Sequence, residues 1–153
     1  MENLIILLAT GIYSGYAPVA PGTAGSVVGV ILGYLVCAPI WRRSPLGFAL
    51  GFAIVFALSC WIAGRAEEIF QQRDCPHIVL DEVLGMVATM YLNPLGWPWL
   101  AAGFVAFRLF DIIKPFPAGL IDRRLGGGSA VMLDDLAAGV YANLAVRILA
   151  RLV

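Results

Sequence analysis

The sequence predicts an all-α fold, a polytopic bundle of four to five membrane helices that includes a short helical hairpin. The first observation is composition, because 61% of the residues are hydrophobic and only 13% are charged, whereas a soluble domain is usually about one quarter charged. The second is that long stretches carry no charge, and about 20 apolar residues suffice for a helix to cross a bilayer. A chain of 153 residues accommodates a single domain, residues 1–153.

The charge balance excludes some classes of function. Lys plus Arg and Asp plus Glu number ten each, so no basic surplus favours a nucleic-acid partner. Glu2 is the charged residue that precedes the first apolar run, and no basic residue does, so we expect no cleaved signal peptide. No pair of cysteines has C-x-x-C spacing, and we interpret all three as structural: Cys37, Cys60 and Cys75.

The first third of the chain predicts a helix, a loop and a membrane helix. No charged residue occurs from Asn3 to Trp41. We expect a short helix over Asn3–Ile12, an ordered loop containing Pro18 and Pro21, and a first membrane helix from about Ser26 to Trp41. Unpaired backbone groups are not tolerated in hydrocarbon, so a loop of this kind must be held within the protein.

A second apolar stretch, Leu46–Gly64, follows a turn at Arg42–Pro45 and has spanning length. The polar segment Arg65–Asp74 is expected to continue this helix beyond the membrane. The final helix is predicted over Val131–Arg151, with two aspartates in its first turn.

The charge-free stretch Val83–Phe107 allows two interpretations, one kinked spanning helix or a helical hairpin. We favour the hairpin because Asn93–Pro98 holds two prolines, a glycine and an asparagine. Trp97 and Trp99 would then suit a membrane interface.

The hairpin determines which segments share a side of the membrane. It brings Pro18–Ser26, Arg65–Glu82 and Arg108–Asp135 to one side, and the Asn93–Pro98 turn and the C-terminus to the other. The first side holds six basic residues and the second holds four, which weakly indicates that the first side faces the cytoplasm: Arg65, Arg73, Arg108, Lys114, Arg123 and Arg124 against Arg42, Arg43, Arg147 and Arg151.

Three charges at steps of three, Arg108, Asp111 and Lys114, lie near one helical face. Pro115 ends the helix just beyond them. Arg108 can bind a phosphate through two parallel hydrogen bonds, and Lys114 can bind it as a point charge. The alternative is an internal ladder of ion pairs with Asp111, and both arrangements are compatible.

Five carboxylates lie near predicted helix ends on this same side. Hard oxygen ligands without a Cys/His set suit Mg²⁺, which takes few protein carboxylates together with waters and phosphate oxygens. The alternative is that they only cap helices and complement helix dipoles. We favour a metal site for the group as a whole: Asp81, Glu82, Asp111, Asp134 and Asp135.

The run Pro21–Ser26 leads into a helix, and backbone N–H groups at a helix start form an anion site. It is not a P-loop, because no Gly-Lys-Ser/Thr follows. Gly22, Thr23 and Ser26 are therefore candidate phosphate ligands. Gly126–Gly128 is a second flexible glycine run.

The sequence contains no pattern typical of an activated nucleophile. Hydrolysis would therefore use a metal-activated water, with a carboxylate as base and the cations stabilising phosphoryl charge. His77, the single histidine, is more readily interpreted as structural. Two alternatives remain: a lipid headgroup phosphotransferase, and a small ion transporter or channel subunit, since intramembrane carboxylates also line ion paths.

Four motifs together resemble the bacterial phosphatidylglycerophosphatase A family. They follow the family's order and cover nearly the whole chain. Ala17 and the pair Pro76-His77 depart from the family pattern without touching its charged residues. The motifs are Ala17–Ser26, Ile78–Met86, Phe107–Pro117, and Gly126–Gly128 with Val131–Gly139.

The resemblance implies a Mg²⁺-dependent phosphatase of the bacterial inner membrane. Such an enzyme removes the terminal phosphate of phosphatidylglycerophosphate, a phospholipid, to give phosphatidylglycerol on the cytoplasmic side. The family's acidic motifs fall on two pairs, which are expected to bind metal or activate water: Asp81-Glu82 and Asp134-Asp135. Its Arg-x-x-Asp-x-x-Lys-Pro motif falls on Arg108, Asp111 and Lys114, with Asp111 expected to orient the two cations.

Overall fold

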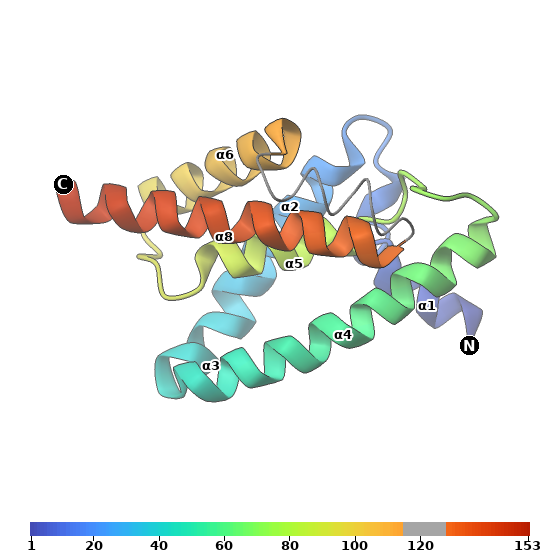
Figure 1. The fold of residues 1–153 in the computed structure, drawn as a ribbon, viewed down its shortest axis with the longest axis horizontal. Helices are drawn as coiled ribbons and strands as arrows, with labels where there is room; N and C mark the ends of the chain where they lie inside the picture. Colours follow the sequence, from blue (N-terminus) through green and yellow to red (C-terminus); the bar gives the residue numbers. More distant parts are fainter. Residues whose placement is uncertain (115–127) are drawn as a thin grey trace.

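The computed structural model describes residues 1–114 and 128–153, and these residues form helices and no strands. The predicted all-α fold is confirmed for this part of the chain. In Figure 1 the carboxyl end of α4 and the amino end of α8 lie at one end of the molecule, while α3 and the C-terminus lie toward the other.

The first membrane helix begins earlier than predicted. After α1 (Glu2–Ala9), helix α2 (Pro21–Leu32) continues through a π-helical segment (Gly33–Cys37) into α3 (Ala38–Arg43). Ala20 precedes it with a left-handed backbone (φ 50°), and Pro21 occupies the first turn, where its missing N–H costs nothing. The assignment of Pro21–Ser26 to a loop was therefore wrong, because proline at this position starts the helix.

Helix α4 (Pro45–Phe70) begins where the side chain of Ser44 accepts a hydrogen bond from the Gly47 N–H at 3.2 Å. It ends at Gln71, which has a left-handed backbone. The prediction that Arg65–Asp74 continues this helix is confirmed as far as Phe70 and is wrong for residues 71–74, which follow the helix end. Figure 1 shows α4 lying diagonally along one side of the bundle.

The predicted helical hairpin is confirmed. Its first arm is α5 (Leu80–Met90) and its second arm is α6 (Trp97–Ile113), with Pro98 in the first turn of α6. Helix α5 is buried along almost its whole length and packs against α2, α6 and α8. The short first arm of the hairpin is therefore the centre of the bundle.

Helix α8 (Gly128–Leu152) starts before the predicted Val131, so Asp134 and Asp135 do not lie in its first turn. They sit about two turns beyond its start. At that position they cannot cap the helix, and the capping interpretation fails for this pair.

Glycines allow the helices to approach α5 closely. Gly25 and Gly29 on α2 and Gly33 at the start of the π-helical segment repeat every four residues, and a Cβ added at Gly29 would lie 2.7 Å from the carbonyl oxygen of Val83. On α8, a Cβ at Gly139 would collide with the carbonyl oxygen of Gly85. Small residues at crossings of this kind are typical of helices packed in membranes.

Within the described residues, two helical segments are long and apolar enough to cross a membrane, Pro21–Arg43 and Pro45–Phe70. Length and composition thus support two of the four to five expected membrane helices. Much of the outer surface is apolar as well, with exposed Val27 and Ile31 on α2, and Leu50, Ile54 and Leu58 on α4. Exposed apolar surface of this extent marks contact with lipid or another protein.

A polar cluster that was not predicted from the sequence lies at the carboxyl end of α5. The side-chain amide of Asn143 donates to the carbonyl oxygens of Thr89 and Tyr91 at 3.0 and 2.7 Å, and Arg147 donates to that of Tyr91 at 3.1 Å. Asn93 donates to Thr89 O at 2.9 Å. These bonds satisfy carbonyls that a helix end leaves unpaired.

Gly139→Ala is expected to destabilise the fold by about 1–3 kcal/mol or more, because a backbone oxygen cannot move aside for the added methyl group. Gly51→Ala is the matched control, since nothing lies within 4 Å of a Cβ at that position. The control should stabilise α4 by about 0.5–1 kcal/mol. Thermal unfolding followed by circular dichroism in detergent measures both, and equal midpoints would contradict close packing at Gly139.

Candidate functional site

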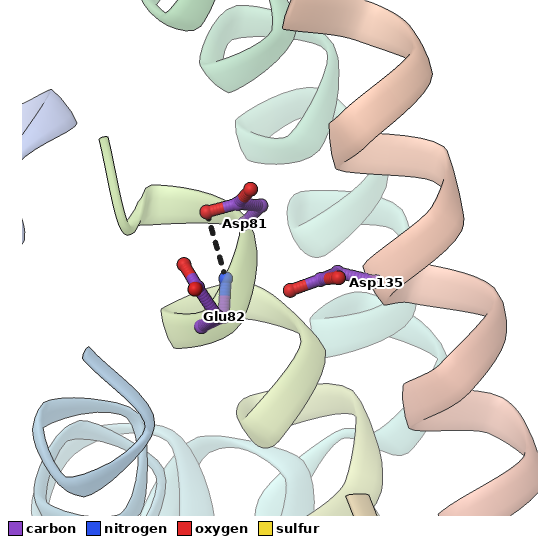
Figure 2. Close-up of side chains that lie close together, drawn as sticks. All are labelled: Asp81, Glu82 and Asp135. Carbon is purple, nitrogen blue, oxygen red and sulfur yellow. Dashed lines mark hydrogen bonds between the residues drawn. The ribbon is translucent and has the colours of Figure 1, made fainter. Parts of the chain in front are cut away.

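Three carboxylates from two helices meet at one end of the bundle. Asp81 and Glu82 begin α5, and Asp135 reaches them from α8; one carboxylate oxygen from each residue lies within 4.8 Å of the others. Figure 2 shows Asp135 pointing toward the first turn of α5, where Asp81 accepts a hydrogen bond from the Glu82 N–H at 3.0 Å. Adjacent side chains diverge by about 100° on a helix, yet both approach the carboxylate of Asp135.

Burial makes this arrangement electrostatically costly. Asp81 and Asp135 are 5% and 4% exposed, and all three residues lie outside the two candidate membrane spans. Burial first, and then the neighbouring charge of Asp81, raises the pKa of Glu82 to about 11. Burial likewise raises the pKa of Asp81, and burial together with the charges of Asp81 and Asp111 raises the pKa of Asp135 well above its ordinary value. A bound cation would reverse these shifts.

Two oxygens of the cluster have no hydrogen-bond partner among the described residues. They are Glu82 Oε2 and Asp135 Oδ2, and both are buried. An unpaired buried acceptor costs about 1–3 kcal/mol. Hard carboxylate oxygens that converge without donors fit a divalent cation such as Mg²⁺.

The predicted cations form two different ion pairs beside this cluster. Arg108 Nη1 lies 2.8 Å from Asp111 Oδ2 within α6. Lys114 pairs with Asp134, which is 2% exposed on α8. Asp111 therefore holds Arg108 as predicted by the helical spacing, while Lys114 links α6 to α8.

The start of α2 contributes one of its three predicted phosphate ligands to the site. Gly22 lies against Glu82, and a Cβ added to it would collide with Glu82 Oε1 and come within 3.3 Å of Arg108 Nη1. Ser26 is fully buried, and its hydroxyl donates to the carbonyl oxygen of Gly22 at 2.9 Å. Thr23 is half-buried and, like Ser26, does not line the cavity described next.

A cavity of about 320 Å³ lies beside the carboxylate cluster. Its lining includes Gly22 from α2, Asp81 and Glu82 from α5, and Arg108 from α6. Glu67, Asp74 and Cys75 also line it, and sequence reasoning did not select them. Glu67 accepts a hydrogen bond from the backbone N–H of Asp74 at 3.0 Å, which joins the end of α4 to the segment before α5.

His77 has structural contacts. Its Nδ1 lies 2.9 Å from the carbonyl oxygen of Gly15, and its ring stacks on Tyr16 with centroids 4.7 Å apart. These contacts fasten the loop before α2 to the segment before α5. Other predicted features lie outside the residues that the structure describes, namely Pro115–Pro117, Arg123, Arg124, and Gly126 and Gly127 of the glycine run.

The sequence matches the family model of phosphatidylglycerophosphatase A over residues 7–150. The chain belongs to this family. It is 38% identical over 145 residues to phosphatidylglycerophosphatase A of Haemophilus influenzae, covering 94% of this chain and 87% of that protein. It is also 38% identical over 143 residues to phosphatidylglycerophosphatase A of Escherichia coli, covering 93% and 81%. No solved structure matches the chain.

Membership agrees with the resemblance found in the motifs. The acidic pairs and the arginine motif all lie within the matched residues. The geometry shows which of these residues meet: both carboxylates of Asp81-Glu82 and that of Asp135 form one cluster, and Arg108 lines the same cavity as Asp81 and Glu82.

In EDTA, the protein should be most stable near pH 5 and lose stability as the pH rises toward 8. The ordinary pKa of Glu82 is 4.5 and its folded-state value is about 11. The stabilisation that the raised pKa of Glu82 contributes is fully present below pH 4.5 and is lost as the pH rises toward 11. The reason is that in this range Glu82 releases its proton in the unfolded chain and keeps it in the folded one. The loss is at most about 1.4 kcal/mol per pH unit for each such group.

Thermal unfolding between pH 5 and pH 8 measures this dependence. Glu82→Gln should weaken it, because the amide does not titrate, whereas exposed Glu68→Gln should leave it unchanged. Stability that rises from pH 5 to pH 8 in EDTA would contradict the argument.

Proposed function

We propose that the protein is a Mg²⁺-dependent lipid phosphatase that hydrolyses phosphatidylglycerophosphate to phosphatidylglycerol and inorganic phosphate. The observation that carries the proposal is the cluster of Asp81, Glu82 and Asp135, of which Asp81 and Glu82 line a cavity together with Arg108. The names of the two bacterial relatives support the substrate.

The three clustered carboxylates are the residues that would hold Mg²⁺. Their unpaired oxygens, Glu82 Oε2 and Asp135 Oδ2, provide ligands without displacing an existing bond among the described residues. When bound, the ion would lower the pKa of a coordinated water and neutralise phosphate charge. Asp134, predicted alongside them, instead positions Lys114.

Other residues of the site bind the phosphate, and a carboxylate accepts the proton of the attacking water. Arg108, held by Asp111, donates N–H groups to the phosphoryl oxygens and stabilises the charge that develops on them. A carboxylate of the cluster accepts the proton of the attacking water. Water oxygen bonds to phosphorus, the bond to the glycerol oxygen breaks, and that oxygen leaves as the alcohol after protonation.

The same proposal places the protein in the bacterial inner membrane as a multi-pass protein. Support comes from the two apolar helical segments and from the apolar outer surface. The carboxyl end of α4 and the start of α8 lie at one end of the bundle (Figure 1), and we assign this end to the cytoplasm because the excess of basic residues is on that side.

Adjacent aspartates on α8 give a matched test of the metal site. Asp135→Asn and Asp81→Asn should reduce Mg²⁺-dependent phosphate release at least about 100-fold, because mutation of residues that merely support metal ligands already costs about 10- to 100-fold. Asp134→Asn should retain Mg²⁺ dependence and raise KM, because it removes the ion pair between Lys114 and α8. Phosphate release from phosphatidylglycerophosphate in detergent, with Mg²⁺ or EDTA, measures these effects.

Equal loss of the response to Mg²⁺ in Asp134→Asn and Asp135→Asn would contradict the different roles given to the two aspartates. No phosphate release by folded wild type would overturn the proposed function.

Arg108→Lys is expected to lower kcat/KM about 10- to 100-fold, because an ammonium cannot reproduce two parallel hydrogen bonds to a phosphate. Arg65→Lys is the control, since Arg65 is half-exposed and pairs with Glu68 on α4. Steady-state kinetics on the same substrate compares them. Wild-type kinetics in Arg108→Lys would remove Arg108 from phosphate binding.

A further inference from the structure

An apolar groove of about 350 Å³ lies between α2 and α6. Every residue described in its lining is apolar, and several are well exposed, with Val27 at 46%, Ile31 at 53% and Val105 at 65%. Its central walls are formed by Val27, Val30 and Ile31 on α2 and by Ala101, Phe104 and Val105 on α6.

The two walls of this groove belong to the helices that also supply the phosphate end of the site. Gly22 begins α2 and Arg108 lies near the end of α6, and a Cβ at Gly22 would be 3.3 Å from Arg108 Nη1. From that meeting point α2 runs away from the cavity while α6 runs toward it. The groove is therefore the apolar continuation of the α2–α6 junction that borders the carboxylates.

Helical rise locates the groove relative to the site. Val105 lies about 4.5 Å from Arg108 along α6, and Trp97, which also lines the groove, lies about 16.5 Å away. Val27 and Ile31 lie about 7.5 and 13.5 Å from Gly22 along α2. The groove thus extends about 12 Å, which fits within one leaflet, half of a hydrocarbon core about 30 Å thick.

We propose that this α2–α6 groove binds an acyl chain of the lipid substrate whose phosphate occupies the carboxylate cavity. The inference rests on the proposed function. In phosphatidylglycerophosphate a phosphodiester joins the phosphorylated headgroup to the glycerol that carries the acyl chains, so an apolar groove beside the headgroup site provides a path for one of those chains. Other apolar cavities lie elsewhere: one is lined by Tyr91 and Asn143 at the far end of α5, and another contacts Ile40 on α3.

The test compares a long-chain and a short-chain substrate. Ala101 is exposed and lies about 10.5 Å from Arg108 along α6, so a phenyl ring in Ala101→Phe would fill the distal half of the groove. We expect kcat/KM for dioleoyl phosphatidylglycerophosphate to fall about tenfold or more. The dihexanoyl lipid, which does not need that half, should be hydrolysed as by wild type. Ile31→Trp, on the opposite wall, should give the same selective loss.

Ala57→Phe is the matched control, because Ala57 is an exposed alanine on α4, away from the groove. It should leave both substrates unaffected. If Ala101→Phe lowered kcat/KM equally for both substrates, the substitution would have distorted the site, and the inference would be overturned. If it lowered kcat/KM for neither substrate, the groove would be filled by bulk lipid, and the inference would also be overturned. A dimer in wild type that dissociates in Ala101→Phe would assign the groove to a second copy. Wild type that releases phosphate from neither lipid would instead overturn the proposed function.

Discussion

The close crossing of α5 with its neighbours is the constraint on which the rest of the structure depends. Gly139 of α8 lies against the backbone of Gly85, and Gly29 of α2 lies against that of Val83. Because these contacts leave no room for side chains, the neighbouring helices approach α5 at nearly backbone distance. That approach brings Asp135 to the start of α5 and places Gly22 beside Glu82. The acidic cluster is therefore a product of helix packing.

The polar side chains at the two ends of α5 have different contacts. At the far end, Asn143 and Arg147 donate hydrogen bonds to carbonyl oxygens, so the polar groups there serve the backbone. At the near end, Glu82 and Asp135 each keep a buried oxygen without a partner among the described residues. Carboxylates that converge on one another and keep unsatisfied oxygens are typical of sites kept for a ligand. Carboxylates gather at the near end, whereas the far end has amide and guanidinium groups bonded to the backbone, and this difference favours a one-sided pocket over an ion path across the bundle.

The candidate site joins surfaces of opposite character. Carboxylates, Arg108 and the start of α2 line one cavity together with apolar residues, while the same α2 and α6 present only apolar side chains to the groove beyond it. An amphiphilic substrate needs both surfaces in continuity, and a soluble phosphate ester needs only the first. The exposed apolar surface of α4 provides a third environment, suited to bulk lipid.

The sequence alone determined the helical class, the hairpin at Asn93–Pro98 and the charged residues that gather at one end. These follow from local causes, namely apolar run length, proline and glycine positions, and charges spaced by helical period. Only the tertiary structure decided that Asp135 joins Asp81 and Glu82 while Asp134 pairs with Lys114. Adjacent residues on a helix face different neighbours, and which one faces α5 depends on how α8 is rotated. That rotation is fixed by contacts such as Gly139 with Gly85, between residues far apart in the chain.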